Sequence, residues 1–181
     1  MAEPASDVSG LLAAMPLSDG RSVLDASRTR PVMLVFLRHM GCTFCREAMA
    51  DLGRIRSELE GVVLPVLVHM SEPARAQATF AKYGLEGIEQ ISDPSRRFYR
   101  GIGLARGGLL QLFGPSNWIR GIQAGLLDGH LVGMLEGDGF QMPGVFILRD
   151  GRVVHAMHHA TAGERPEYLA LAHRASMKEP V

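Results

Sequence analysis

The sequence predicts an α/β protein of three layers, in which helices flank a mixed central sheet. Residues 32–37 and 62–68 are apolar runs without alternation, which is typical of strands buried on both faces. Each run is followed by a segment with helical periodicity. Two later apolar runs flank Asp150 and Gly151, a dipeptide typical of a tight hairpin turn. A strand–helix–strand–helix half followed by a strand–strand–helix half therefore gives a sheet with parallel and antiparallel neighbours.

Apolar spacing places the helices of the first half. A helix is predicted over residues 43–60, with Gly61 ending it, because four apolar residues recur at intervals of three and four: Ala48, Leu52, Ile55 and Leu59. A second helix is predicted from Pro73 to about residue 83, with Ser71 as its cap. The strand before it contains Pro65, which denies the ladder one hydrogen bond.

The remaining elements are shorter. A strand is expected over residues 88–91, and a third helix, capped by residues 92–94, is expected to run through Tyr99. Residues 145–148 and 152–155 read as the hairpin strands, and residues 164–174 as a closing helix.

The length of 181 residues predicts one folded domain, assigned to residues 26–175. Residues 1–25 are expected to form an arm or a short helix, and residues 176–181 a tail. Within the domain, residues 101–141 mix glycine with apolar residues and are predicted to be a glycine-rich helical insertion.

Composition excludes several classes of partner. Lys and Arg together number 19 and so do Asp and Glu, so nothing in the charge favours nucleic acid or an anionic membrane surface. No apolar run approaches the roughly 18 residues of a membrane span. The N-terminus has neither the basic nor the apolar region of a secretory signal, and we expect a cytoplasmic protein.

The chain has two cysteines, Cys42 and Cys45, placed where the first strand ends and the first helix begins. A helix N-terminus stabilises a thiolate, and this spacing allows a disulfide within one helical turn. The sequence therefore predicts thiol redox chemistry, with Cys42 attacking from an exposed rim and Cys45, more shielded, resolving. The alternative is that both are small buried apolar residues.

Basic side chains around the cysteines are candidates for supporting a thiolate. Arg38, His39 and Arg46 are near enough in sequence to do so, and each could instead be a solvated residue. A further basic cluster could dock an acidic reductant or simply be a solvated helix face, and comprises Arg96, Arg97, Arg100 and Arg106.

Three histidines, His155, His158 and His159, raise the alternative of a zinc site shared with the two cysteines. About 110 residues separate the two groups, which is far from the spacing of common zinc motifs. We expect no metal, with His155 along a strand and the other two in an exposed turn.

Two stretches carry a family resemblance. Residues 36–46 (FLRHMGCTFCR) and 136–148 (EGDGFQMPGVFIL) resemble the peroxiredoxin-like branch of the AhpC/TSA antioxidant family, which has a thioredoxin-like fold. The resemblance implies an oxidoreductase that reduces hydroperoxides, with Cys42 attacking and Cys45 resolving. It implies that Pro143 is a cis-proline facing the active-site sulfur. It also implies no organic cofactor and a thiol reductant such as a thioredoxin-type protein. A homodimer stays open, and residues 101–141 are a candidate for its surface.

The sequence departs from the family at two positions. Peroxiredoxins carry a Pro and a Thr or Ser ahead of the attacking cysteine, where this chain has Leu37 and His39. Peroxide would then have to be bound by backbone N–H groups and by Arg38, His39 or Arg46. Two alternatives stay open: a thiol–disulfide oxidoreductase with little peroxidase activity, and a non-catalytic redox sensor.

Overall fold

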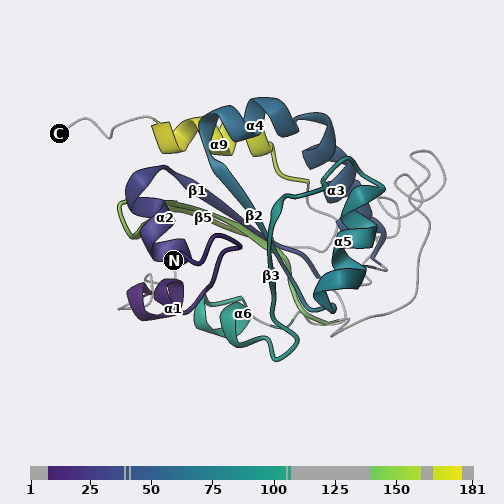
Figure 1. Ribbon diagram of the computed structural model, residues 1–181, viewed down its shortest axis with the longest axis horizontal. Helices are drawn as coiled ribbons and strands as arrows, with labels where there is room; N and C mark the ends of the chain where they lie inside the picture. Colours follow the sequence, from purple (N-terminus) through teal and green to yellow (C-terminus); the bar gives the residue numbers. More distant parts are fainter. Residues whose placement is uncertain are drawn as a thin grey trace.

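The computed structural model describes residues 8–38, 40, 42–104, 106, 140–159 and 165–176. In this part of the chain, five strands form one sheet in the order β3-β2-β1-β4-β5 (Figure 1). The strands are β1 (Val32–Phe36), β2 (Leu64–His69), β3 (Glu89–Ser92), β4 (Gly144–Arg149) and β5 (Arg152–His158). The first three are parallel, whereas β4 runs antiparallel to β1 and β5 antiparallel to β4. The predicted mixed sheet is confirmed.

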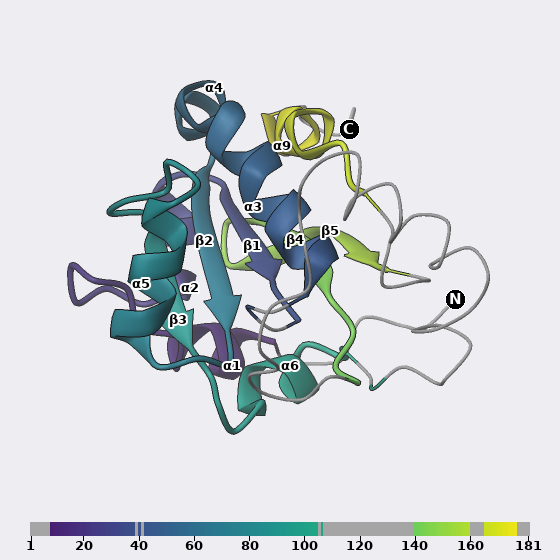
Figure 2. The same cartoon turned by 90° about the vertical axis from the view of Figure 1, so that its right-hand side faces the viewer.

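Helices cover both faces of this sheet, which gives the three predicted layers (Figure 2). One face carries α3 (Thr43–Arg54), α4 (Arg56–Val62), α5 (Pro73–Ala81) and α9 (Tyr168–Ser176). The other carries α1 (Ser9–Ala13), α2 (Val23–Thr29) and α6 (Arg97–Gly101).

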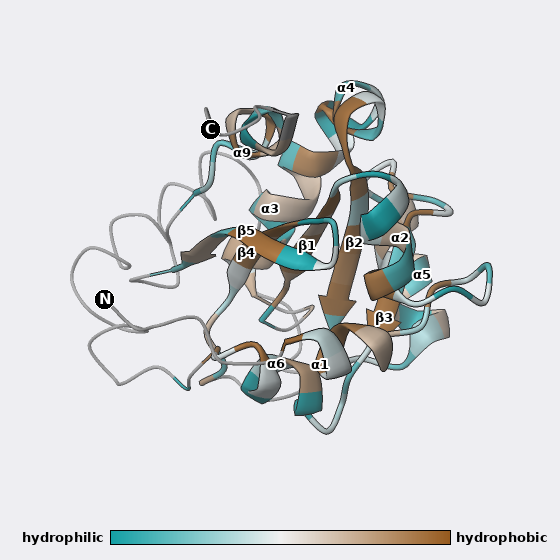
Figure 3. Cartoon of the chain, turned by 90° about the vertical axis from the view of Figure 1, so that its left-hand side faces the viewer, coloured by the Kyte–Doolittle hydropathy of each residue, from teal (hydrophilic) through white to brown (hydrophobic). Residues whose placement is uncertain are grey.

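Alternate side chains of the central strand β1 point to opposite faces of the sheet, and each set packs in a hydrophobic core. Met33 and Val35 of β1 belong to the cluster under α3, and Leu34 and Phe36 to the cluster on the opposite face. All five residues of β1 are buried, which explains why its sequence is apolar without a break. Coloured by hydropathy, the central strands are almost wholly hydrophobic (Figure 3).

The helix predicted over residues 43–60 is wrong in one respect, because the chain breaks into α3 and α4 at Ile55. The break turns the chain toward β2, which starts at Leu64. Gly61 does not end the second piece, since α4 continues to Val62. Glycine ends a helix where a positive φ is needed, and Gly61 has no positive φ.

Two predicted helix starts are also corrected. The N-cap of α5 is Glu72, without a side-chain cap, while Ser71 is buried and its carbonyl accepts the Ser92 hydroxyl at 2.8 Å. Pro73 occupies the first turn as predicted. The closing helix begins at Tyr168 instead of residue 164, because Pro166 disfavours helical backbone in the residue before it.

One local prediction is confirmed and another is corrected. Asp150 and Gly151 have φ of 51° and 76°, the two positive values that a tight hairpin turn requires. Pro65 is tolerated inside β2 because Leu64 bonds toward β1, so the proline nitrogen faces the side of β3. Pairing with β3 starts only at Val66, so the prediction that Pro65 costs the ladder a hydrogen bond is wrong.

Near the N-terminus, Leu12 and Met15 have no exposed surface and pack in the core beneath the sheet. The division into an arm, a domain and a tail stays a prediction, and nearly all of the predicted insertion at 101–141 lies outside the described residues. Within the ranges that the structure describes, no helix is long and apolar enough to cross a membrane.

Candidate active site

The two cysteines lie where β1 gives way to α3. Cys42 is the N-cap of α3, with extended backbone (φ −75°, ψ 126°), and Cys45 lies in its first turn. Both thiols are free, and both residues are buried, with exposed fractions of 6% and 4%. The expectation that Cys42 sits on an exposed rim is therefore wrong.

Three kinds of contact lower the pKa of Cys42 to about 6. The largest is the hydrogen bond with the Cys45 thiol, and the backbone N–H groups of Cys45 and Phe44 add to it. The positive charge of Arg38 acts in the same direction, with Nη1 at 3.7 Å from Sγ, while burial opposes the shift. A thiol with this pKa is about 90% thiolate at pH 7. The Cys42 thiol is thus mostly ionised at neutral pH, which is the form that reacts as a nucleophile.

Arg38 contacts both sulfur atoms. Its backbone N–H donates to Cys45 Sγ at 3.2 Å, and its guanidinium donates to Cys42 Sγ. The residue is only 8% exposed, so the charge acts in a poorly solvated environment. The structure thus brings Arg38 to the thiols, as the sequence predicted.

The thiols line a cavity of about 440 Å³, part of which is open to solvent. Its walls come from the end of β1, the start of α3, the start of β4 and the segment leading into α9. Most of the lining is apolar, and the polar groups in it are Arg38, Glu47, His159, Arg165 and Tyr168.

Glu47 and Arg165, which both line this cavity, belong to a cluster of charged side chains. Glu47 of α3 is 4% exposed and lies 3.4 Å from Arg165, whose guanidinium also makes two hydrogen bonds to Asp51 at 2.6 and 2.7 Å. Arg165 precedes α9, so this contact fastens the segment before α9 to α3. Sequence reasoning missed all three residues; the only available signal was a glutamate on the same helix as the cysteines.

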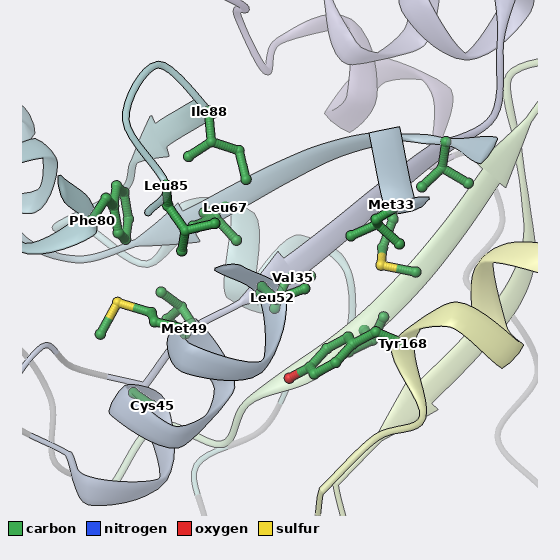
Figure 4. Packing of buried hydrophobic residues seen from close by; sticks show 14 of the residues in the cluster. Met33, Val35, Cys45, Met49, Leu52, Leu67, Phe80, Leu85, Ile88 and Tyr168 are labelled. Carbon is green, nitrogen blue, oxygen red and sulfur yellow. The ribbon is translucent and has the colours of Figure 1, made fainter. Parts of the chain in front are cut away.

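Tyr168 is a second lining residue that the sequence did not point to. Its ring packs in the core between α3 and the sheet, with the oxygen directed toward α3 (Figure 4). Burial raises the pKa of the Tyr168 hydroxyl well above its usual value, and the charges of Asp51, Cys45 and Glu47 add to the effect. The hydroxyl therefore stays protonated beside the thiols.

The histidines separate in the structure. His155 lies half-buried along β5 as expected, and His158 is exposed at the end of that strand. His159 is half-buried and lines the thiol cavity, so its expected place in an exposed turn is wrong. Its backbone N–H donates to the Pro143 carbonyl, which draws it to the cavity. In the described ranges, no three His, Cys, Asp or Glu residues are grouped as a metal site would require.

Of the other predicted supporting residues, one lines the thiol cavity, one does not, and one lies outside the described residues. Pro143 lines the cavity, but no peptide bond in the described part of the chain is cis, so the expected cis-proline is wrong. The trans isomer is the intrinsically favoured one for an X–Pro bond. Arg46 is not among the lining residues, and its Nε donates to the Met40 carbonyl at 3.5 Å. His39 lies outside the described residues.

The basic cluster around α6 stands away from the thiols. Arg97 and Arg100 are exposed, and Arg97 stacks over the ring of Phe98. Neither residue lines the cavity. A docking role for this cluster stays a prediction.

Comparison with known proteins places the chain in a family. Residues 51–161, more than half of the chain, match the model of the AhpC/TSA antioxidant enzymes. The chain belongs to the peroxiredoxin-like AhpC/TSA family. The matched residues begin after both cysteines, so family membership rests on the body of the fold and not on the Cys-x-x-Cys segment.

Curated relatives agree with this assignment. Peroxiredoxin-like 2C of Bos taurus is 28% identical over 163 residues, which cover 82% of this chain and 70% of the relative. Peroxiredoxin-like 2C of Homo sapiens is 30% identical over 142 residues, covering 72% of this chain and 62% of the relative. Peroxiredoxin-like 2A of Homo sapiens is 27% identical over 156 residues, covering 82% and 64%.

Solved structures of low identity share the fold. The bacterioferritin comigratory protein of Xanthomonas campestris has a TM-score of 0.64 and 14% identity, over 97% of this chain and 98% of that one. Reduced Prx3 of Vibrio vulnificus, solved with H₂O₂, has a TM-score of 0.58 and 15% identity, over 95% and 99%. The predicted thioredoxin-like fold is confirmed, and membership of the AhpC/TSA family indicates an oxidoreductase.

Proposed function

We propose that this AhpC/TSA protein is a thiol peroxidase in which Cys42 attacks a hydroperoxide and Cys45 resolves the product. The observation that carries the proposal is the Cys42 thiol, whose pKa of about 6 makes it a thiolate at neutral pH, facing a cavity that also holds Arg38. The Xanthomonas campestris neighbour was studied for alkyl peroxide reduction, which supports the same chemistry here.

The proposed reaction has two steps. The Cys42 thiolate attacks the peroxide oxygen, the O–O bond breaks, and the departing alkoxide or hydroxide takes up a proton, leaving Cys42 as a sulfenic acid. The Cys45 thiol then attacks the Cys42 sulfur, so that an S–S bond forms and water leaves. An external dithiol, such as a thioredoxin-type protein, restores the pair by exchange. No cofactor takes part.

Among the residues that the structure describes, Arg38 is the one that we propose binds the peroxide. The resemblance implies that a Thr or Ser would normally help to bind peroxide, and this chain has His39 at that position. A guanidinium is a strong donor to developing negative charge on oxygen, and Arg38 already lies beside Sγ of Cys42. It would thus serve both the thiolate and the leaving oxygen.

The test is the second-order rate of the fully reduced protein with H₂O₂ and with a bulkier organic hydroperoxide. The natural protein should react orders of magnitude faster than free cysteine. Cys42→Ser should abolish the reaction, whereas Cys45→Ser should react once and stall as a sulfenic acid that a dimedone probe traps. Equal loss in both variants would contradict the division of roles.

A second candidate function is thiol–disulfide exchange. It is favoured by Leu37, which lines the cavity where peroxiredoxins have a proline, and by the missing hydroxyl residue. In this case the H₂O₂ rate would be close to that of free cysteine, while a disulfide substrate would be reduced with turnover. A redox sensor would instead consume about one equivalent of oxidant even with a recycling reductant present.

We also propose that the protein can form a homodimer. Size-exclusion chromatography with light scattering would measure its oligomeric state.

A further inference from the structure

One peptide unit connects the core of the protein to the thiol pair. The Leu37 carbonyl accepts a hydrogen bond from the Tyr99 hydroxyl, and the N–H of the same peptide, from Arg38, donates to Cys45 Sγ at 3.2 Å. Two hydrogen bonds therefore act at opposite ends of the same rigid plane. Any tilt of this plane moves the donor away from the sulfur.

The Tyr99 hydroxyl is held by the framework of the fold. Tyr99 has no exposed surface, and its hydroxyl also lies 3.0 Å from the Val68 carbonyl, which accepts the Leu37 N–H at 2.9 Å. Its ring meets Phe36 edge-to-face, with centroids 4.9 Å apart. The hydroxyl thus sits where β1 and β2 both end.

The helix that carries Tyr99 is anchored independently of the thiols. The Asp93 carboxylate accepts the backbone N–H groups of Arg97 and Phe98 at 2.9 and 2.7 Å. Asp93 is itself 3% exposed, so these charge-assisted bonds form in a poorly solvated setting. This anchoring fixes α6 and, with it, the direction from which Tyr99 reaches the Leu37 carbonyl.

We propose that Tyr99 is a positioning residue of the thiol pair, which acts by fixing the Leu37–Arg38 peptide so that its N–H stays directed at Cys45. The donors then form one chain: the Tyr99 hydroxyl to the Leu37 carbonyl, the Arg38 N–H to Cys45, and the Cys45 thiol to Cys42. Each donor that also accepts becomes a stronger donor, so the chain ends by stabilising the Cys42 thiolate. The inference shares one assumption with the proposed function, which is that Cys42 and Cys45 cycle between a dithiol and a disulfide.

The chain favours the reduced form over the disulfide. A hydrogen bond to an anionic sulfur is stronger than one to a neutral sulfur, and the disulfide leaves both sulfurs neutral. In exchange with glutathione, the disulfide and two glutathione molecules give the dithiol and glutathione disulfide, with two electrons moving to the protein. Removing the Tyr99 hydroxyl should therefore shift this equilibrium toward the protein disulfide.

Tyr99→Phe tests the inference, with Tyr168→Phe as the matched control. Tyr168 is equally buried and near the same sulfurs, but its hydroxyl makes no hydrogen bond to the described residues that join β1 to α3. Tyr99→Phe should lower the acid dissociation constant of Cys42 about three- to tenfold, read from thiolate absorbance near 240 nm, because one hydrogen bond contributes about 1 kcal/mol. The equilibrium constant with glutathione should shift by a similar factor. Tyr168→Phe should move both quantities by less than about twofold.

A folded Tyr99→Phe protein with both quantities unchanged would overturn the inference, as would equal shifts in the two variants. If Tyr99→Phe does not fold, the amide ¹⁵N shift of Arg38 is followed in the natural protein during a pH titration of the reduced form. It should titrate with the midpoint of Cys42, and a flat response would also refute the inference. Neither readout uses peroxide, so a protein without peroxidase activity can still pass or fail this test.

Discussion

At the scale of single residues, the reactivity of Cys42 depends on a few groups within one helical turn. The Cys45 thiol and two backbone N–H groups lower its pKa against the cost of burial, and Arg38 adds a charge at 3.7 Å. The same thiol placed at a helix N-terminus without the arginine would ionise less readily. The pH dependence of reaction is therefore a direct measure of these contacts.

The rate of Cys42 alkylation by iodoacetamide should rise with pH and level off above its pKa of about 6, because the thiolate is the reactive form. Arg38→Met should move the midpoint upward by about 0.5–1 unit, since a positive neighbour favours the charged thiolate. The measurement is the pseudo-first-order rate between pH 5 and 9, with circular dichroism to confirm that the variant is folded.

Arg46→Met is the matched control for this experiment. Arg46 is also close in sequence to the cysteines, but its Nε bonds the Met40 carbonyl and it does not line the cavity. In Arg46→Met, the midpoint of Cys42 alkylation should stay within a few tenths of a pH unit of that in the natural protein. An equal shift in both variants would show that general charge, and not the Arg38 contact, sets the pKa.

At the scale of elements, the position of α3 depends on a close approach to the end of α5. A Cβ at Gly53 would lie 1.9 Å from the Tyr83 carbonyl oxygen, so glycine is required there by space and not by its backbone angles. This contact sets how near α3, with Cys42 as its N-cap and Cys45 in its first turn, can lie to the end of α5.

Gly53→Ala should destabilise the protein by more than about 2 kcal/mol, although alanine is the better helix former, because the backbone carbonyl cannot move aside cheaply. Gly61→Ala is the matched control: it is also a helical glycine, and a Cβ there meets nothing within 4 Å. This control should be stabilised by about 0.5–1 kcal/mol. Urea unfolding measures both, and a stable Gly53→Ala protein would contradict the close packing.

At the scale of the whole molecule, the ionised Cys42 links thiol chemistry to folding stability. The folded pKa of about 6 lies below that of an unfolded cysteine, about 8.5, so between these values the unfolded chain binds more protons. The stabilisation of the folded state by ionised Cys42 is fully present above about pH 8.5 and is lost as pH falls through about 6.

For the reduced protein, the free energy of unfolding should increase from pH 6 to pH 8.5, with a slope that approaches about 1.4 kcal/mol per unit. The measurement is urea unfolding at several pH values with a phosphine reductant present. Cys42→Ser should remove most of this slope while leaving the fold intact. A slope that persists in Cys42→Ser would assign it to other groups.

The sequence by itself determined the order of the strands and helices and the place of the cysteines between them. Unbroken apolar runs mark strands that a sheet buries on both faces, and the Asp-Gly turn requires only local backbone angles, so neither depends on distant residues. The Cys-x-x-Cys spacing likewise sets two thiols within one turn of α3. These features are local, and a single chain segment decides each of them.

Only the tertiary structure decided the surroundings of the thiols. Tyr99 lies more than fifty residues beyond Cys45, and Arg165 and Tyr168 more than a hundred, and it is the sheet order that brings them to the end of β1. The burial of Cys42 is of the same kind, because exposure depends on which distant segments cover a residue. Long-range contacts leave no periodicity in the sequence, and for this reason the chemistry of the pair could be predicted while its electrostatic setting could not.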